Sequence, residues 1–145
     1  MKVLVQKCTS ALVEVDNRVV GSIDKGLMLL VGFTDTDNSS IIDYMVDKVI
    51  NLRIFNDEKG IMNKSLLDIK GSILSVSQFT LYADTSKGRR PSYIKAMSGN
   101  KANILYNEFN KKLKEKNIHI ETGIFGADMK VTLTNDGPTT IMLEK

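Results

Sequence analysis

The sequence has few of the residues from which disulfides and metal clusters are built. Among its 145 residues there is one cysteine, one histidine and no tryptophan. The single thiol, Cys8, cannot form an internal disulfide or supply a cysteine-based zinc cluster. Because Cys8 lies in an apolar-rich first segment, we expect a buried and unreactive thiol. A chain without disulfides suits a reducing compartment.

Long apolar runs are also missing. No stretch approaches the roughly 18 consecutive apolar residues of a transmembrane helix. The N-terminal run MKVLVQKCTS is too short in apolar residues for a secretory leader and has no small-residue cleavage site. We therefore expect a cytoplasmic protein that does not bind membranes.

The motifs of common catalytic sites are absent as well. The sequence contains no HExxH, CxxC, GxGxxG or Walker loop, so we expect neither a metal nor a cofactor. The only histidine, His119, alternates with Ile118 and Ile120, which predicts the polar face of a strand and a structural or solvent-facing role. A Ser-His-Asp triad needs a histidine beside a nucleophile, and no nucleophile adjoins His119 in the sequence.

The net charge of +3 is small, but its distribution is uneven. Lys87, Arg89 and Arg90 lie within four residues, and five lysines occur between residues 101 and 116. Basic clusters of this kind can contact phosphates. A charged loop and a solvated helix face explain them equally well.

Hydrophobic patterning predicts one mixed α/β domain over residues 1–145. Period-2 and continuous apolar patterns indicate strands, expected within 3–5, 12–15, 18–23, 27–33, 72–77, 130–134 and 139–143. A turn is expected at Asp16-Asn17, and residues 55–64 resemble a loop or irregular hairpin turning at Gly60. Apolar residues at three- and four-residue steps predict two helices, over 41–50 after N-cap residues 37–40 and over 102–113. This pattern does not determine which strands pair.

Two segments are unusual. In 77–83, the polar residues Ser77, Gln78 and Thr80 interrupt an apolar run that leaves a predicted strand. Thr80 could act as a nucleophile if a base activated it, or it could hydrogen-bond the chain locally. In 135–140, Asn, Asp, Gly and Pro all favour a turn, and the pattern alone favours an ordinary trans bond before Pro138.

Taken together, these segments resemble the two signatures of the D-aminoacyl-tRNA deacylases. Residues 77–84, SQFTLYAD, match the SQFTLxA signature, and residues 135–138, NDGP, match the second. Residues 87–92, KGRRPS, resemble the loop after the first signature. The remaining similar stretches are 52–55, 62–66 and 125–129. The resemblance runs from the first predicted strand to the last.

The resemblance implies a mixed, partly barrel-like sheet with two main helices, and a cytoplasmic homodimer that hydrolyses the ester of D-aminoacyl-tRNA. Ser77, Gln78, Phe79 and Thr80 would line the catalytic site. Gly137 and Pro138, joined by a cis bond, would reach into the neighbouring subunit's pocket and reject L-aminoacyl groups. The other residues of this substrate-binding filter would be Asn135, Thr139 and Met129. Lys87, Arg89 and Arg90 would contact the tRNA.

The sequence departs from the family at Thr139, where relatives often carry Val or Phe, which affects local packing near the filter. Glycine has no side chain for a chirality filter to exclude, so the resemblance also implies action on glycyl-tRNA mischarged on tRNA(Ala). For catalysis we expect backbone N–H groups around Phe79 and a ribose hydroxyl of the RNA to act, with attack by Thr80 as the alternative. Two other functions stay open: a non-catalytic RNA-binding dimer, and a Thr- or Ser-dependent hydrolase of small esters.

Overall fold

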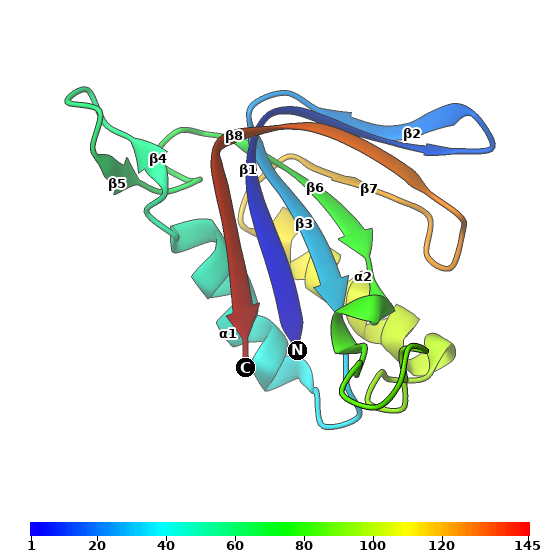
Figure 1. Ribbon diagram of the computed structural model, residues 1–145. Helices are drawn as coiled ribbons and strands as arrows, with labels where there is room; N and C mark the ends of the chain where they lie inside the picture. The colour runs from blue at the N-terminus through cyan, green and yellow to red at the C-terminus, as the bar shows by residue number, and fades with distance from the viewer.

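A computed structural model describes residues 1–145 as a six-stranded mixed sheet with two α-helices (Figure 1). Neighbouring strands follow the order β2-β1-β3-β6-β7, and β8 pairs with β1 on its other side. The strands of this sheet are β1 (Lys2–Val15), β2 (Arg18–Ile23), β3 (Gly26–Gly32), β6 (Ser72–Ser77), β7 (Ile120–Thr122) and β8 (Lys130–Glu144). A separate small hairpin is formed by β4 (Phe55–Asn56) and β5 (Met62–Lys64).

The sheet is nearly closed into a barrel because β1 pairs with different strands along its length. Residues 2–8 of β1 pair with β3, and residues 11–15 pair with β2. The hairpin between β1 and β2 turns at Asp16-Asn17, as expected, with φ of 49° and 59°. A side chain on Gly21 would lie 2.9 Å from the carbonyl oxygen of Thr122, so glycine allows β2 to approach β7. These features confirm the expected partly barrel-like mixed sheet.

Two strand predictions were wrong for the same reason. The first segment is one strand of 14 residues rather than two short ones, and β8 is one strand of 15 residues rather than two strands separated by a turn. Both long strands bend but remain paired with each other. Gln6 pairs with Thr140 and Cys8 with Asn135. Four residues of β8, 136–139, therefore bulge opposite a single residue of β1, and the Gly137-Pro138 bond within the bulge is cis rather than trans.

Both helices lie on one side of the sheet (Figure 1). Helix α1 (Ser39–Asn51) begins at Asn38, whose Oδ1 accepts hydrogen bonds from the N–H groups of Ser40 and Ile41 at 3.0 and 3.3 Å. Helix α2 (Gly99–Glu115) buries one stripe, as its periodicity predicts. Those buried residues are Ala102, Tyr106, Phe109, Asn110 and Leu113.

The main core lies between the helices and the sheet and contains 23 buried residues. Strand β3 contributes Leu27, Leu29 and Val31, and nearly all of its residues are buried, as its continuous apolar run predicts. A smaller core of seven residues includes Cys8, which is buried as expected. Neither helix is long and apolar enough to cross a membrane.

Candidate active site

A largely apolar cavity of about 550 Å³ lies where the parallel strands β3 and β6 end. Its walls come from the ends of these strands, the loop before α2, the first turn of α2 and the segment that leads into β8. Of its 18 lining residues, 12 are hydrophobic. The size and character suit a small-molecule or nucleoside-sized group, for which pockets of ~300–1,000 Å³ are usual.

The first signature contributes Ser77, Gln78 and Phe79 to the lining of this cavity. The last register pair of the parallel ladder is Val31 with Ser77, after which the N–H of Gln78 donates to the Val31 carbonyl at 2.7 Å. A 3₁₀ turn, η1 (Phe79–Tyr82), begins at once. Within that turn the first donor is the Leu81 N–H, which bonds the Gln78 carbonyl at 3.4 Å. The N–H groups of Phe79 and Thr80 therefore have no acceptor inside the turn.

Two aromatic rings lie at the mouth of the cavity. Phe79 is 55% exposed and Tyr93 is 40% exposed. Their ring centroids lie 5.0 Å apart at an interplanar angle of 71°, an edge-to-face contact. Phe125, in the segment before β8, also lines the cavity and packs against the buried Tyr106 with ring centroids 5.8 Å apart. An exposed aromatic surface of this kind can stack on a nucleobase.

The hydroxyl of Thr80 has a local partner. The side-chain amide of Gln78 donates to Thr80 Oγ1. No histidine or lysine lines the cavity, and its one carboxylate, Asp128, is exposed. The cavity lining thus includes Phe79 but not Thr80, and no base is hydrogen-bonded to the Thr80 hydroxyl.

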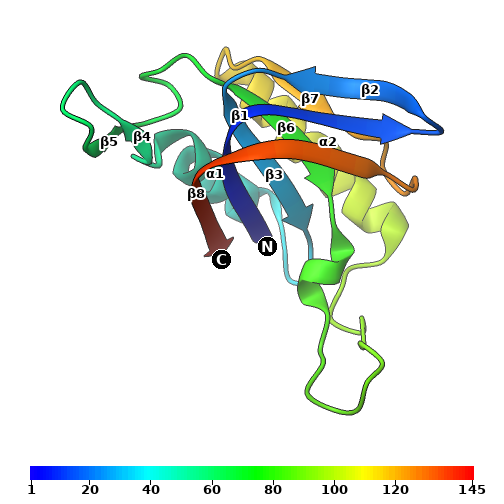
Figure 2. The ribbon, with the colours of Figure 1, turned by 45° about the horizontal axis from the view of Figure 1, so that its top comes forward.

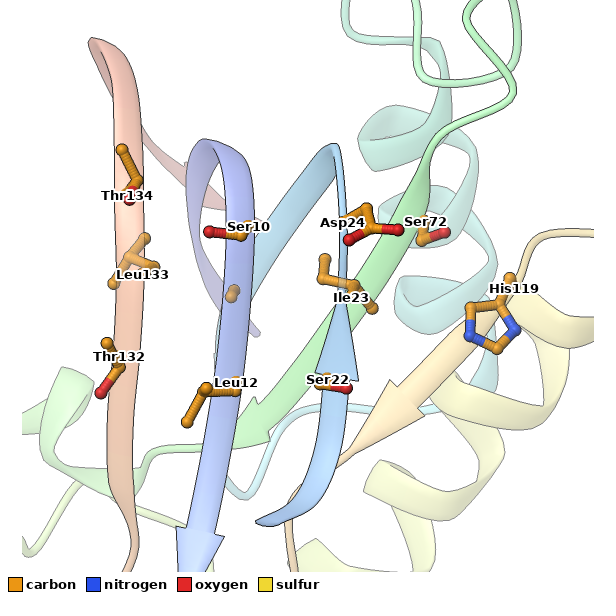
Figure 3. A pocket seen from close by; sticks show the side chains of 11 residues that line it. Ser10, Leu12, Ser22, Ile23, Asp24, Ser72, His119, Thr132, Leu133 and Thr134 are labelled. Atoms are coloured by element: carbon orange, nitrogen blue, oxygen red, sulfur yellow. The ribbon is translucent and has the colours of Figure 1, made fainter.

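His119 lies in a different depression, of about 390 Å³, on the outer face of the sheet (Figure 3). Its neighbours there include Ser22 in β2, Asp24 directly after β2 and Ser72 at the start of β6 (Figure 3). His119 Nε2 instead pairs with Glu121 Oε1 at 3.2 Å, and the His119 side chain is 63% exposed. No hydrogen bond joins it to any of these hydroxyls. The solvent-facing role expected for His119 agrees with this placement.

The structure brings some of the residues expected at the site together and leaves others apart. Ser77, Gln78, Phe79 and Met129 line the cavity, whereas Thr80, which was expected to line it, does not because it lies one residue further into the 3₁₀ turn. Gly137 and Pro138 are exposed and do not line the cavity of their own chain. Near them, Asn135 Nδ2 donates to Thr140 Oγ1 at 2.8 Å, while Thr139 is half-buried. No group of three or more His, Cys, Asp or Glu side chains lies close enough together to hold a metal ion.

The basic loop lies beside the cavity. Figure 2 shows the chain after η1 extending beyond the body of the molecule. The loop is closed at its base by reciprocal backbone hydrogen bonds between Asp84 and Ser92, at 2.8 and 2.9 Å. Hydrogen bonds from Ser86 lower the pKa of the Asp84 carboxyl below its ordinary value. Lys87, Arg89 and Arg90 are exposed on this loop, and Tyr93, which directly follows it, lines the cavity.

Sequence reasoning missed several of the lining residues. The missed residues belong to segments distant from the first signature in sequence: Phe33, Tyr93, Ala96, Met97, Ala102, Phe125, Gly126, Ala127 and Asp128. Residues 125–129 resembled the family, but only Met129 was assigned to the site. Their neighbouring position depends on long-range packing that local patterns do not encode.

The fold and the cavity define a mixed-sheet domain with a ligand-sized site at the ends of parallel strands, an arrangement typical of enzymes. The sequence model of the D-Tyr-tRNA(Tyr) deacylase family matches residues 4–144. The chain belongs to this family, which confirms the resemblance of its two signatures. A deacylase of this kind is a hydrolase, which is the class of enzyme that the resemblance implied.

Similar proteins cover the whole chain. Proteins named D-aminoacyl-tRNA deacylase from Bacillus pumilus and Listeria monocytogenes are each 56% identical to it over 144 residues, or 99% of this chain, and these matches cover 98% and 95% of the respective relatives. A solved structure titled "c-Myc DNA Unwinding Element Binding Protein" is 40% identical, with a TM-score of 0.94 over 100% of this chain and 99% of that one. A probable eukaryotic D-amino acid tRNA deacylase, 19% identical over 98% of this chain and 97% of its own, has the same fold with a TM-score of 0.82.

Proposed function

We propose that this chain, acting as one domain over residues 1–145, hydrolyses the ester bond of D-aminoacyl-tRNA and releases the free D-amino acid and the tRNA. The observation that carries the proposal is the apolar, aromatic-edged cavity lined by Phe79, the first residue of the 3₁₀ turn in the first signature, in a chain of this family. Because aminoacyl-tRNA is found in the cytoplasm, we propose that the protein acts there.

The cavity suits the aminoacyl-adenosine end of the tRNA. Its volume of about 550 Å³ accommodates a nucleoside and a side chain. Phe79, Tyr93 and Phe125 offer aromatic surface for the base. The carboxylate of Asp128 is the complementary charge for the protonated amino group of an aminoacyl ester.

For the chemistry, we assign the N–H groups of Phe79 and Thr80 to the developing oxyanion. Water adds to the ester carbonyl and gives up a proton, the negative charge gathers on the carbonyl oxygen, and collapse breaks the bond to the ribose oxygen, which takes up that proton. The 2′- or 3′-hydroxyl of the terminal ribose next to the ester positions the water and passes this proton. Thr80 is not the nucleophile in this scheme because its hydroxyl faces the Gln78 amide rather than a base.

A second copy of the chain would distinguish D-aminoacyl from L-aminoacyl groups. Gly137 and Pro138 are exposed, lie outside the cavity of their own chain, and belong to a strand whose outer edge is unpaired. We assign them to the partner's cavity in a homodimer, where a rigid backbone wall beside the α-carbon excludes the L side chain. Glycine, which has no side chain, passes this filter, so glycyl-tRNA mischarged on tRNA(Ala) is also a substrate.

The deciding experiment compares hydrolysis of D-Tyr-tRNA and L-Tyr-tRNA at matched, low enzyme concentration. Rapid release from the D form alone supports both the activity and the filter. Thr80→Ala should keep most of this activity, and a complete loss with fold and tRNA binding intact would replace the backbone scheme by attack from Thr80. Activity on free D-amino-acid esters without tRNA would instead favour a small-ester hydrolase.

A second candidate function is that of a nucleic-acid-binding dimer without catalytic activity. The 40% identical solved structure with a DNA-element-binding title and the exposed basic loop favour it. In a single-turnover incubation, such a binder would protect the ester of D-Tyr-tRNA or leave it unchanged. Release of D-tyrosine above the uncatalysed rate excludes this reading.

A further inference from the structure

The backbone carbonyl of Ser75, in β6, is a junction between three parts of the chain. It accepts a hydrogen bond from the Tyr106 hydroxyl of α2 at 2.7 Å. It accepts a second from the N–H of Gly123, directly after β7, at 3.0 Å. Because a carbonyl oxygen has two lone pairs, these two donors use its full capacity. The position of α2 and that of the chain leaving β7 are therefore both fixed against one atom of β6.

Each of these three parts contributes to the apolar cavity a short distance further along. β6 ends at Ser77, residues 125–129 follow Gly123, and Ala102 lies one turn before Tyr106 on α2; all of these except Gly123 and Tyr106 line the cavity. Tyr106 lies behind the cavity wall. It can therefore affect a molecule in the cavity only through the groups that it holds.

The ring of Tyr106 makes a second link to the same wall. Its centroid lies 5.8 Å from that of Phe125, with the two planes tilted by 45°, and Tyr106 is only 3% exposed. Burial raises the pKa of the Tyr106 hydroxyl above its ordinary value, so at neutral pH the group keeps the proton that it donates to Ser75. Hydroxyl and ring together connect the end of β6 to residues 125–129.

The segment held in this way is closely packed. A Cβ atom on Gly123 would lie 2.5 Å from Met129 Sδ, so the chain returns close to Gly123 six residues later. Met129 lines the cavity, as Phe125 does. A movement of Gly123 relative to β6 would therefore move cavity-lining side chains with it.

We propose that Tyr106 is a positioning residue for the aminoacyl end of the tRNA. This inference rests on the proposed function, which places the amino group of the substrate at Asp128 and its ester carbonyl at Phe79. Phe79 follows β6 and Asp128 belongs to residues 125–129, so the junction at Ser75 sets the distance between these two groups. A misplacement of about 1 Å can lower a rate about 100-fold. Tyr106 acts on the reaction through this spacing, without contacting the substrate.

The test is Tyr106→Phe, which removes the hydroxyl and keeps the ring against Phe125. It should lower kcat for D-Tyr-tRNA about tenfold and change KM by less than about twofold, because the surface that binds the substrate is retained and its alignment is not. The matched control is Tyr82→Phe, the same change at a second buried tyrosine that does not line the cavity, which should behave as the wild type. A wild-type kcat per folded molecule in Tyr106→Phe, or an equal loss in Tyr82→Phe, would overturn the inference.

Gly123→Ala provides an independent arm because it disturbs the same segment at its other bond to Ser75. It should also lower kcat. The double variant with Tyr106→Phe should lose less than the product of the two single losses, since both groups bond one carbonyl and their effects are coupled. Single losses that simply multiply would show that Tyr106 acts by another route.

Hydrogen–deuterium exchange tests the inference separately from the proposed function. In Tyr106→Phe, peptides that cover residues 123–129 should exchange several-fold faster, whereas those of β3 should keep their wild-type protection. If the wild type hydrolyses neither D-Tyr-tRNA nor L-Tyr-tRNA, the proposed function fails, and exchange in 123–129 still decides whether Tyr106 holds this wall. Unchanged exchange in that segment would overturn the inference.

Discussion

The ammonium group of Lys7 lies 3.3 Å from Asp136 Oδ2, across the bulge between β1 and β8. Lys7 is 5% exposed, whereas the Asp136 side chain is 46% exposed. Lys7 is the single residue of β1 opposite the four bulged residues of β8, 136–139. The ion pair therefore ties the segment that contains Gly137 and Pro138 to the adjoining strand.

Because the two partners are buried to different extents, removing them should have unequal effects. Asp136→Asn leaves a buried ammonium group without its counter-charge and should lower the unfolding free energy by about 1–2 kcal/mol, below the ~3–5 kcal/mol of a fully buried pair because water reaches Asp136. Lys7→Met leaves a hydrated carboxylate and should destabilise the protein less. Urea unfolding of the two variants measures this, and a larger loss for Lys7→Met would contradict the explanation.

Phe79 should contribute to substrate binding through its exposed ring. Phe79→Ala should raise KM for D-Tyr-tRNA about 5- to 100-fold, because stacking on an aromatic ring is worth about 1–3 kcal/mol per base. Phe79→Trp should restore most of the binding. Ile94→Ala is the control, since Ile94 follows Tyr93 and is 90% exposed but does not line the cavity. A normal KM in Phe79→Ala would show that the ring does not contact the substrate.

Local sequence features determined much of the fold. The helix beginning at Asn38, the buried strand β3 and the turn at Asp16-Asn17 each follow from residues close in sequence. The continuity of β8 did not, because its two halves are joined by pairing with β1, more than 100 residues earlier. Asn, Asp, Gly and Pro favour a turn locally, and the long-range ladder overrides that preference by turning them into a bulge.

The residues of the candidate site also fall into some that the sequence predicted and some that only the structure revealed. The signature residues Ser77, Gln78 and Phe79 could be found from the sequence because they are contiguous. Phe125 and Asp128 could not, since only the packing of the segment before β8 against α2 brings them to the cavity. The absence of a base beside Thr80 also required the structure, because it depends on what surrounds the hydroxyl in space.

His119 should be dispensable for catalysis. It is exposed, pairs with Glu121, and lines a depression that shares no residue with the apolar cavity. His119→Ala should therefore change kcat/KM for D-Tyr-tRNA by less than about twofold and leave its pH profile unaltered, because the side chain contacts no residue of the cavity lining. Steady-state kinetics across the neutral pH range provide the measurement. A large loss in kcat would make the histidine part of the reaction.

Stability should decrease in alkaline solution because several buried groups keep their protons in the fold. Burial raises the pKa of the Cys8 thiol above 9.0, and burial raises the pKa values of the Tyr82 and Tyr106 hydroxyls above 10.0. Above these ordinary values the unfolded chain binds fewer protons than the folded one, so the unfolding free energy falls as pH rises. The urea midpoint should fall as pH rises above about 9, where the unfolded thiol loses its proton, and more steeply above about 10, where the unfolded tyrosines lose theirs. Cys8→Ala should flatten the part of this decrease that begins near pH 9, whereas an unchanged slope would assign it to other groups.

Arg89 and Arg90 should determine much of the salt dependence of tRNA binding. Both are exposed on the loop closed by Asp84 and Ser92, and Tyr93, which directly follows this loop, lines the cavity. We therefore expect a tRNA with its terminal adenosine in the cavity to pass close to them. Arg89→Ala/Arg90→Ala should weaken tRNA binding and lower the slope of log Kd against log salt by about 0.7 to 0.9 for each phosphate that the protein no longer neutralises. D-tyrosyl-adenosine, which has no phosphate, should be hydrolysed at the wild-type rate. Equilibrium binding between about 50 and 200 mM salt measures the slope, and wild-type affinity with an unchanged slope would place the tRNA backbone on another face.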